Sequence, residues 1–168
     1  MLRLLVFLSL LGLSVALIGR TQSSGVKGIL KCNGKPAAGV KVKLYDDDRG
    51  IDADDLMASG KTDAQGMFEL KGYTDEITTI DPKLNIYHDC EDGMKSFLYL
   101  SFKKNLNTEI IDVIKPKQIC HLQPCQRKIT IKIPDSYVSS GKVPKKIYDA
   151  GTVELAGKFK GEERDCLN

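Results

Sequence analysis

The sequence predicts an all-β protein in which two antiparallel sheets pack into a β-sandwich. After an apolar N-terminal run, seven or eight short segments alternate apolar and polar residues, which is the two-residue period of a half-buried strand. Gly, Pro, Asn and Asp separate these segments at short intervals, as in sandwich domains. No segment after the N-terminal run has a sustained 3.6-residue apolar period, so helices are not expected.

The clearest strands lie between Gly39 and Tyr73. Residues 40–45 alternate, with apolar side chains on one face, and an acidic loop with six carboxylates follows at residues 46–55. Segment 56–62 leads into a tight turn at residues 63–66, whose Gly tolerates positive φ, and a strand follows at residues 67–70. This stretch therefore predicts three strands, an acidic loop and a turn.

Four further strands are expected, at residues 26–32, 84–88, 126–133 and 151–157. The first ends at the tight-turn dipeptide Asn33-Gly34, and Pro134 ends the third. In that third strand we expect Ile129, Ile131 and Ile133 to face the core, and Lys128, Thr130 and Lys132 to face solvent.

The N-terminus predicts a cleaved signal peptide, residues 1–16, and hence a secreted protein. Arg3 precedes an apolar run from Leu4 to Leu17, which is shorter than the roughly 18–20 residues that span a membrane. Small residues favour cleavage after Ala16, with cleavage after Gly19 as the alternative. No second apolar run is long enough to span a membrane, so the mature chain is expected to have no transmembrane segment.

Length and net charge limit the number of domains and the kinds of partner that we expect for this chain. A mature chain of about 150 residues makes one domain, which we place at residues 26–168. The net charge of +3 is too small to indicate nucleic-acid binding, and we expect no cofactor. Five cysteines in a secreted chain are candidates for disulfides.

The order of motifs resembles the nematode transthyretin-like family of secreted proteins over nearly the whole mature chain. This resemblance implies a transthyretin-like (prealbumin-like) sandwich of two antiparallel sheets. The residues that carry it are Gly34-Lys35-Pro36-Ala37, residues 39–46, Thr62-Asp63 with Gly66 and Phe68, Asp81-Pro82-Lys83-Leu84, Tyr87-His88-Asp89-Cys90, Pro124-Cys125-Gln126-Arg127-Lys128, Ile133-Pro134 with Tyr137-Val138, Leu155-Ala156-Gly157-Lys158-Phe159, and Arg164-Asp165-Cys166.

One segment departs from the family pattern. Residues 96–123 stand where the family has a short hairpin connection, and they contain the fifth cysteine, Cys120. We interpret this segment either as a genuine loop extension or as an unspliced intron translated into the sequence. A peptide that joins Lys95 directly to Pro124 would establish the second interpretation.

Without that segment an even four cysteines remain: Cys32, Cys90, Cys125 and Cys166. Four cysteines permit three pairings, and the sequence does not choose among them. Because Cys90 and Cys125 flank one expected hairpin, we expect them to pair, which leaves Cys32 for Cys166.

Basic residues provide the main lead to a binding site. Three of them belong to the expected strand at residues 126–133, where we place all three on the outward face, and three follow in the next loop. If they meet in space they would attract anionic lipid head groups or sulfated glycans. The six residues are Arg127, Lys128, Lys132, Lys142, Lys145 and Lys146.

Two other segments suggest a functional site, a cation site and a catalytic histidine, but for each a structural explanation is favoured. The acidic loop, with Asp46, Asp48, Asp52 and Asp54, offers oxygen ligands for a cation such as Ca²⁺, but its spacing is not that of an EF-hand, and a solvated loop is favoured. His88 next to Asp89 suggests catalysis, yet His88 shares a face with apolar residues and is favoured as a structural histidine.

The resemblance also bears on function. Enzyme relatives of transthyretin that hydrolyse hydroxyisourate carry a His near the first strand and end in Tyr-Arg-Gly-Ser, and both features are missing here, so we expect no enzyme and no catalytic residues. Some family members act as extracellular bridging factors that recognise phosphatidylserine on dying cells, and others are linked to host interaction or neuronal signalling.

We therefore expect a secreted, non-enzymatic binding protein whose partner is an extracellular protein or an anionic lipid surface. The alternative is a carrier of a small apolar ligand in an oligomeric channel, an argument from the fold alone. The sequence leaves the oligomeric state open: a stable tetramer in gel filtration would favour the carrier, and a monomer or dimer the surface-binding protein.

Overall fold

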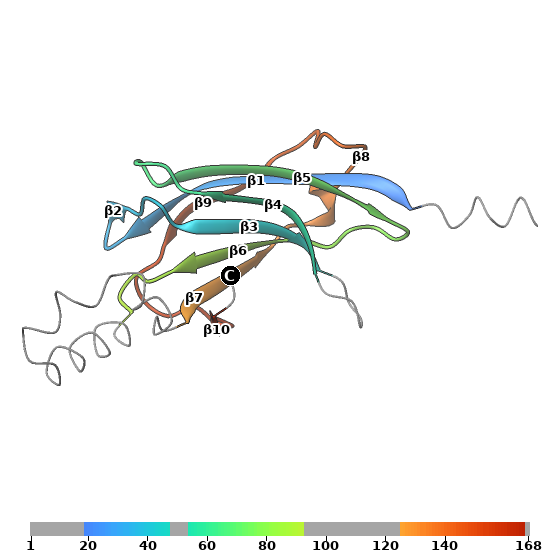
Figure 1. Cartoon of the computed structure of the whole chain (residues 1–168). Coiled ribbons are helices and arrows are strands. Elements are labelled where there is room, and N and C mark those ends of the chain that lie inside the picture. The colour runs from blue at the N-terminus through green and yellow to red at the C-terminus, as the bar shows by residue number, and fades with distance from the viewer. Residues whose placement is uncertain (1–18, 48–53, 93–124, 167–168) are drawn as a thin grey trace, which may run out of the picture.

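The computed structural model describes residues 19–47, 54–92 and 125–166, and within them the chain forms a two-sheet β-sandwich (Figure 1). The predicted signal peptide and segment 96–123 lie outside these residues. No described helix is long and apolar enough to cross a membrane. The elements are β1 (Arg20–Cys32), β2 (Lys35–Pro36), β3 (Lys41–Asp46), β4 (Asp55–Lys61), β5 (Met67–Glu76), β6 (Pro82–His88), β7 (Gln126–Lys132), the 3-10 turn η3 (Asp135–Tyr137), β8 (Ser139–Ser140), β9 (Tyr148–Glu154) and β10 (Glu163–Asp165).

The strands divide into two sheets of five. In the first, β1 lies between β5 and β9, and the short strands β2 and β8 also pair with β1. The second has the order β10-β7-β6-β3-β4. Strand β9 runs parallel to β1, and every other pairing is antiparallel. The expected all-β sandwich is thus confirmed.

Alternation along the strands builds the core between the sheets. In β3, Val42 and Leu44 are fully buried, whereas the intervening lysines reach the surface. Strand β7 contributes Ile129 to the same core, as expected. Burying one such side chain stabilises the fold by about 1.5–3 kcal/mol. The buried cluster comprises Val26, Leu30, Val42, Leu44, Phe68, Leu70, Leu84, Ile86, Ile129, Ile133 and Leu155.

Strand β1 is longer than the sequence pattern indicates. It begins at Arg20, six residues before the expected start at Val26, and its N-terminal half pairs with β5 and β8. This half is polar and lies before the domain start expected from the sequence, but Ser23 and Ser24 are fully buried. Backbone pairing therefore compensates for the missing apolar alternation.

Two glycines sit where the chain permits no side chain. Gly66 closes the predicted turn with a φ of +77°, and a Cβ there would lie 2.3 Å from the Leu30 carbonyl oxygen. Gly72 on β5 packs against β4, so that a Cβ would meet the Met57 carbonyl oxygen at 2.5 Å. This contact lets β4 and β5, which belong to different sheets, approach closely.

The two disulfides differ from the expected pairing. Cys32 pairs with Cys90, and Cys125 pairs with Cys166. The first joins the ends of β1 and β6 and so ties the two sheets together. The second follows from strand register, since Gln126 of β7 lies opposite Asp165 of β10, which sets the two cysteines next to each other. The expectation of a Cys90–Cys125 bond was wrong because β10 occupies the edge of β7.

Candidate anion-binding surface

The outer face of the second sheet carries lysines from four adjacent strands. Cross-strand partners point to the same face, so strand register places Lys61, Lys41, Tyr87 and Lys128 in one row across β4, β3, β6 and β7. Parallel rows contain Lys43 with Asn85 and Thr130, and Tyr45 with Lys83 and Lys132. We call this surface the basic face: Lys41, Lys43, Lys61, Lys83, Lys128 and Lys132, with Tyr45 and Thr130, and with the buried side chains of Asn85 and Tyr87 among them.

Aromatic rings support one of these lysines. The Lys43 ammonium lies 5.4 Å from the ring centroid of Tyr87 and 5.7 Å from that of Tyr45, within the range of cation–π attraction. Its Nζ also donates a hydrogen bond of 3.1 Å to the Tyr45 hydroxyl. These contacts fix a positive charge near the centre of the basic face.

Carboxylates neutralise the lysines at two edges of the basic face. The Lys83 ammonium lies 2.6 Å from Asp47 and 2.7 Å from Asp54. Burial disfavours the charged form of Lys83, but the hydrogen bonds to both carboxylates outweigh it and raise the pKa of Lys83. The hydrogen bond from Lys83 in turn lowers the pKa of Asp47. Lys132 also reaches Asp47 at 3.4 Å, and Lys128 lies 2.8 Å from Glu163 of β10.

Three lysines of the basic face keep an uncompensated charge. Within the described part of the chain, Lys41, Lys43 and Lys61 form no ion pair with a carboxylate. None of the three is among the six basic residues that the sequence predicts for a binding patch, because those six are close to one another along the chain. The pattern Val40-Lys41-Val42-Lys43 contained the signal, since it sets two lysines on the solvent face of a strand.

Of the six predicted basic residues, Lys128 and Lys132 lie on the basic face. Lys142, Lys145 and Lys146 lie in the loop between β8 and β9, against the first sheet. The Lys142 ammonium sits 5.2 Å from the ring centroid of Tyr73, on the outer side of β5. The loop lysines and the basic face therefore belong to opposite sides of the sandwich and do not form one patch.

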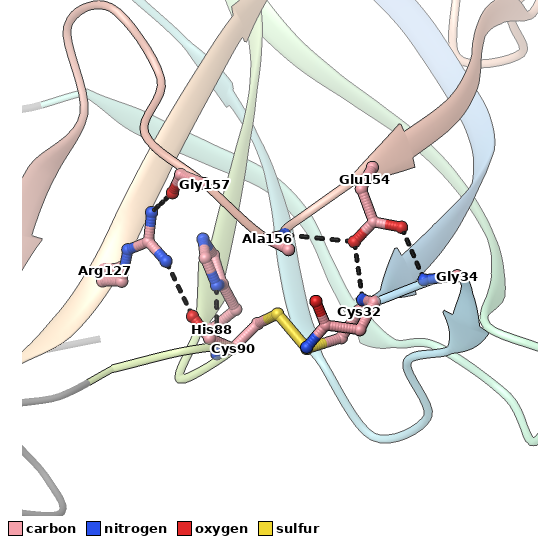
Figure 2. Close-up of a disulfide and its surroundings, with 9 residues drawn as sticks. Cys32, Gly34, His88, Cys90, Arg127, Glu154, Ala156 and Gly157 are labelled. Carbon is pink, nitrogen blue, oxygen red and sulfur yellow. Dashed lines mark hydrogen bonds between the residues drawn. A yellow bond between two sulfur atoms is a disulfide. The ribbon is translucent and has the colours of Figure 1, made fainter.

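Arg127 does not face outward, contrary to the prediction. It shares the inward side of β7 with Ile129 and is 5% exposed. Its guanidinium binds the Glu162 carboxylate with two hydrogen bonds of 2.6 Å, and it also donates to the carbonyl oxygens of Cys90 and Gly157 (Figure 2). The hydrogen bonds from Arg127 lower the pKa of Glu162.

His88 lies between Arg127 and the Cys32–Cys90 disulfide (Figure 2). The ring is 2% exposed, and its Nδ1 accepts a hydrogen bond of 3.3 Å from the Cys90 N–H. Burial, assisted by the positive charge of Arg127, lowers the pKa of His88 to about 4. The His88 ring is therefore neutral and enclosed in the folded protein.

The predicted acidic loop is only partly described. Asp46 belongs to β3, is buried, and accepts a hydrogen bond of 2.7 Å from the Asp81 N–H. Asp54 binds Lys83, while Asp48 and Asp52 lie outside the described residues. Among residues 19–47, 54–92 and 125–166, no group of three or more His, Cys, Asp or Glu side chains is arranged to hold a metal ion.

Comparison with known proteins identifies the family. A family model described as the TTR-52 transthyretin-like family matches residues 27–134. The chain is 57% identical to transthyretin-like protein 5 of Caenorhabditis elegans, over 99% of both chains. It is 49% identical to transthyretin-like protein 33 and 46% identical to transthyretin-like protein 2 of the same organism, covering 88% and 92% of this chain and 84% and 89% of those relatives. The chain therefore belongs to the transthyretin-like family.

Proposed function

We propose that this chain is a secreted, non-enzymatic binding protein that attaches to anionic cell surfaces through the basic face of its second sheet. In this role it would bridge an anionic lipid surface and a second extracellular partner. The observation that carries the proposal is the set of six lysines on four adjacent strands, three of which have no carboxylate partner within the described residues.

The arrangement of these lysines supports surface attachment. Neighbouring strands are about 4.8 Å apart, so Lys41 and Lys61, which are direct partners on β3 and β4, present their charges side by side on a rigid scaffold. Lys43, two residues along β3 on the same face, adds a third charge. Each basic residue near an anionic bilayer contributes about 1 kcal/mol. Three such residues would supply about 3 kcal/mol, which corresponds to attachment in the millimolar range that weakens as salt shortens the Debye length.

Two features support an extracellular location. Disulfides persist in oxidising compartments, and the fold holds two of them, Cys32–Cys90 and Cys125–Cys166. The N-terminal residues 1–16 also have the charge and apolar run of a signal peptide.

The test is co-sedimentation of the purified mature protein with vesicles of phosphatidylcholine, with and without phosphatidylserine. We expect binding only to the anionic vesicles, decreasing as NaCl is raised. The triple variant Lys41→Glu/Lys43→Glu/Lys61→Glu should lose binding by more than about tenfold, because it removes and reverses three surface charges.

A variant with the same change in charge on the other side of the sandwich provides the matched control. Lys142→Glu/Lys145→Glu/Lys146→Glu alters the β8–β9 loop and leaves the basic face intact. If this control abolishes vesicle binding while the basic-face variant retains it, the loop is the contact surface and the proposal fails. Circular dichroism verifies that both variants are folded.

A further inference from the structure

A hollow of about 460 Å³ lies at one end of the basic face. It is bordered by the connection before β3, the ends of β3, β4 and β6, the first residue of β7, and the Cys32–Cys90 disulfide. Its volume falls within the range of sites for small molecules and far exceeds that of a bare inorganic anion.

The charged groups around this hollow favour an anion. Lys41 and Lys61 both line it, and they are direct cross-strand partners on β3 and β4. Asp89 is the only acidic residue among the described lining residues, and its Oδ2 accepts a hydrogen bond of 3.1 Å from Gln126 Nε2. His88 is buried and neutral, so it adds no charge. Two ammonium groups therefore face one carboxylate that is already hydrogen-bonded.

The lysine spacing suits a tetrahedral oxyanion. Cα atoms of directly opposed residues in an antiparallel pair lie about 4.5–5.5 Å apart, so both ammonium groups can approach different oxygens of a single sulfate or phosphate group. The apolar part of the wall, including Val40 and Leu155, leaves room for the organic group that carries the oxyanion.

A second hollow, of about 630 Å³, differs from the first in the charges that line it. It lies beside β1, β5 and β9 and is lined by Lys27 and Lys61 but also by Asp63, Glu69 and Asp149. Lys27 is paired with Asp149 at 3.7 Å. With three carboxylates and two ammonium groups, this hollow does not favour an anion.

We infer that the hollow beside the Cys32–Cys90 disulfide binds the sulfate or phosphate ester group of a small polar molecule, held between Lys41 and Lys61. The inference rests on the proposed function, because it assigns a discrete site to one end of the same basic face. A sulfated sugar unit of a glycan and the phosphodiester head group of a lipid share this chemistry.

Isothermal titration calorimetry on the full mature protein tests the inference with three soluble probes. They are a sulfated heparin disaccharide, its unsulfated counterpart, and glycerophosphoserine. We expect heat from at least one probe that carries an oxyanion and none from the unsulfated disaccharide. A response to the heparin disaccharide alone identifies a glycan as the source of the oxyanion, and a response to glycerophosphoserine alone identifies a lipid.

Substitutions locate the site. Lys41→Gln and Lys61→Gln should each raise the Kd for the responding probe by about tenfold, which is the loss of one charge-assisted contact. Lys71→Gln, on the outer face of the first sheet and paired with Glu69, is the control and should leave the Kd unchanged. Equal binding of sulfated and unsulfated disaccharides, no binding of any probe, or insensitivity to both Lys41→Gln and Lys61→Gln would overturn the inference.

The calorimetric test of the hollow and the vesicle test of the proposed function can fail independently of each other. Vesicle binding without binding of any soluble probe would refute the hollow but leave the basic face as a surface for bilayers. Binding of a soluble probe without vesicle binding would uphold the hollow and refute attachment to anionic bilayers.

Discussion

The pKa of His88 is set by its burial in the sandwich and by the charged groups around it. Its ring is enclosed at the end of β6, and the charged groups that act on it are Arg127, Glu162, Asp89 and Asp92. Burial is the dominant cause of its lowered pKa, and the guanidinium of Arg127 adds to the effect. His88 is therefore neutral in the folded protein at pH 7.

This lowered pKa predicts how stability depends on pH. The unfolded chain binds a proton at His88 near pH 6.5, whereas the folded chain does so only near pH 4, so the unfolded state binds more protons between these values. The free energy of unfolding should thus fall by about 3 kcal/mol as pH drops from 6.5 to 4. Urea unfolding of wild type and His88→Gln measures this.

The comparison isolates the histidine, because the carboxylates titrate in both proteins. Glu162 and Asp47 have lowered pKa values, so both proteins should lose further stability in acid. His88→Gln should show a shallower slope between pH 6.5 and 4, whatever its absolute stability. An equal slope in the two proteins would show that His88 titrates normally.

At the scale of elements, β10 depends on contacts that its three residues alone could not supply. Arg164 binds the fully buried Asp92 side chain with two hydrogen bonds of 2.7 and 2.8 Å, and Glu162 binds Arg127. The Cys125–Cys166 disulfide adds a covalent link. Together they keep β10 on the edge of β7, where an open strand edge would invite pairing with other chains.

Removing either disulfide should lower the free energy of unfolding by a similar amount. The strands that are loosened should differ between the two variants. The two bonds close chain segments of 58 and 41 residues, so each should stabilise the fold by about 4 kcal/mol in the chain-entropy model. Both variants should therefore exchange faster throughout the core, and in Cys125→Ser/Cys166→Ser the additional local increase should lie in β10 and the adjacent end of β7. In Cys32→Ser/Cys90→Ser, it should extend to the ends of β1 and β6. The same exchange pattern in both variants would contradict this division.

Local sequence signals predicted the elements better than they predicted the contacts between them. Asn33-Gly34 forms the turn it indicates, with φ values of +53° and +72°, and Asp63 closes the next turn by accepting hydrogen bonds from the Gln65 and Met67 N–H groups. Strand alternation likewise placed Ile129 in the core. These features depend on neighbours along the chain.

Contacts between distant strands escaped sequence reasoning. The disulfide pairing depends on β10 lying beside β7, and a three-residue strand in a charged tail has no apolar alternation to reveal it. The basic face depends on the register of four strands, which joins Lys61 to Lys41 and Tyr87 to Lys128. Arg127 alternates with Ile129 and so lies on the inward side of β7, although its charge is typical of an outward-facing residue.

At the scale of the whole molecule, the sandwich separates two groups of lysines. The basic face covers the second sheet, and the β8–β9 loop carries Lys142, Lys145 and Lys146 next to the first (Figure 1). A protein that attaches to a surface through one side keeps the other side available. This separation is consistent with the proposed bridging role, in which the first sheet would face the second partner.

Lysine acetylation footprinting in the presence of phosphatidylserine vesicles distinguishes the basic face from the β8–β9 loop as the attachment surface, because it measures the reactivity of each lysine in the wild-type protein. A brief acetylation, with and without vesicles, is followed by mass spectrometry of the modified peptides. We expect vesicles to protect Lys41, Lys43 and Lys61, while Lys142, Lys145 and Lys146 react at unchanged rates. Protection of the loop lysines with continued reactivity of the basic face would contradict it.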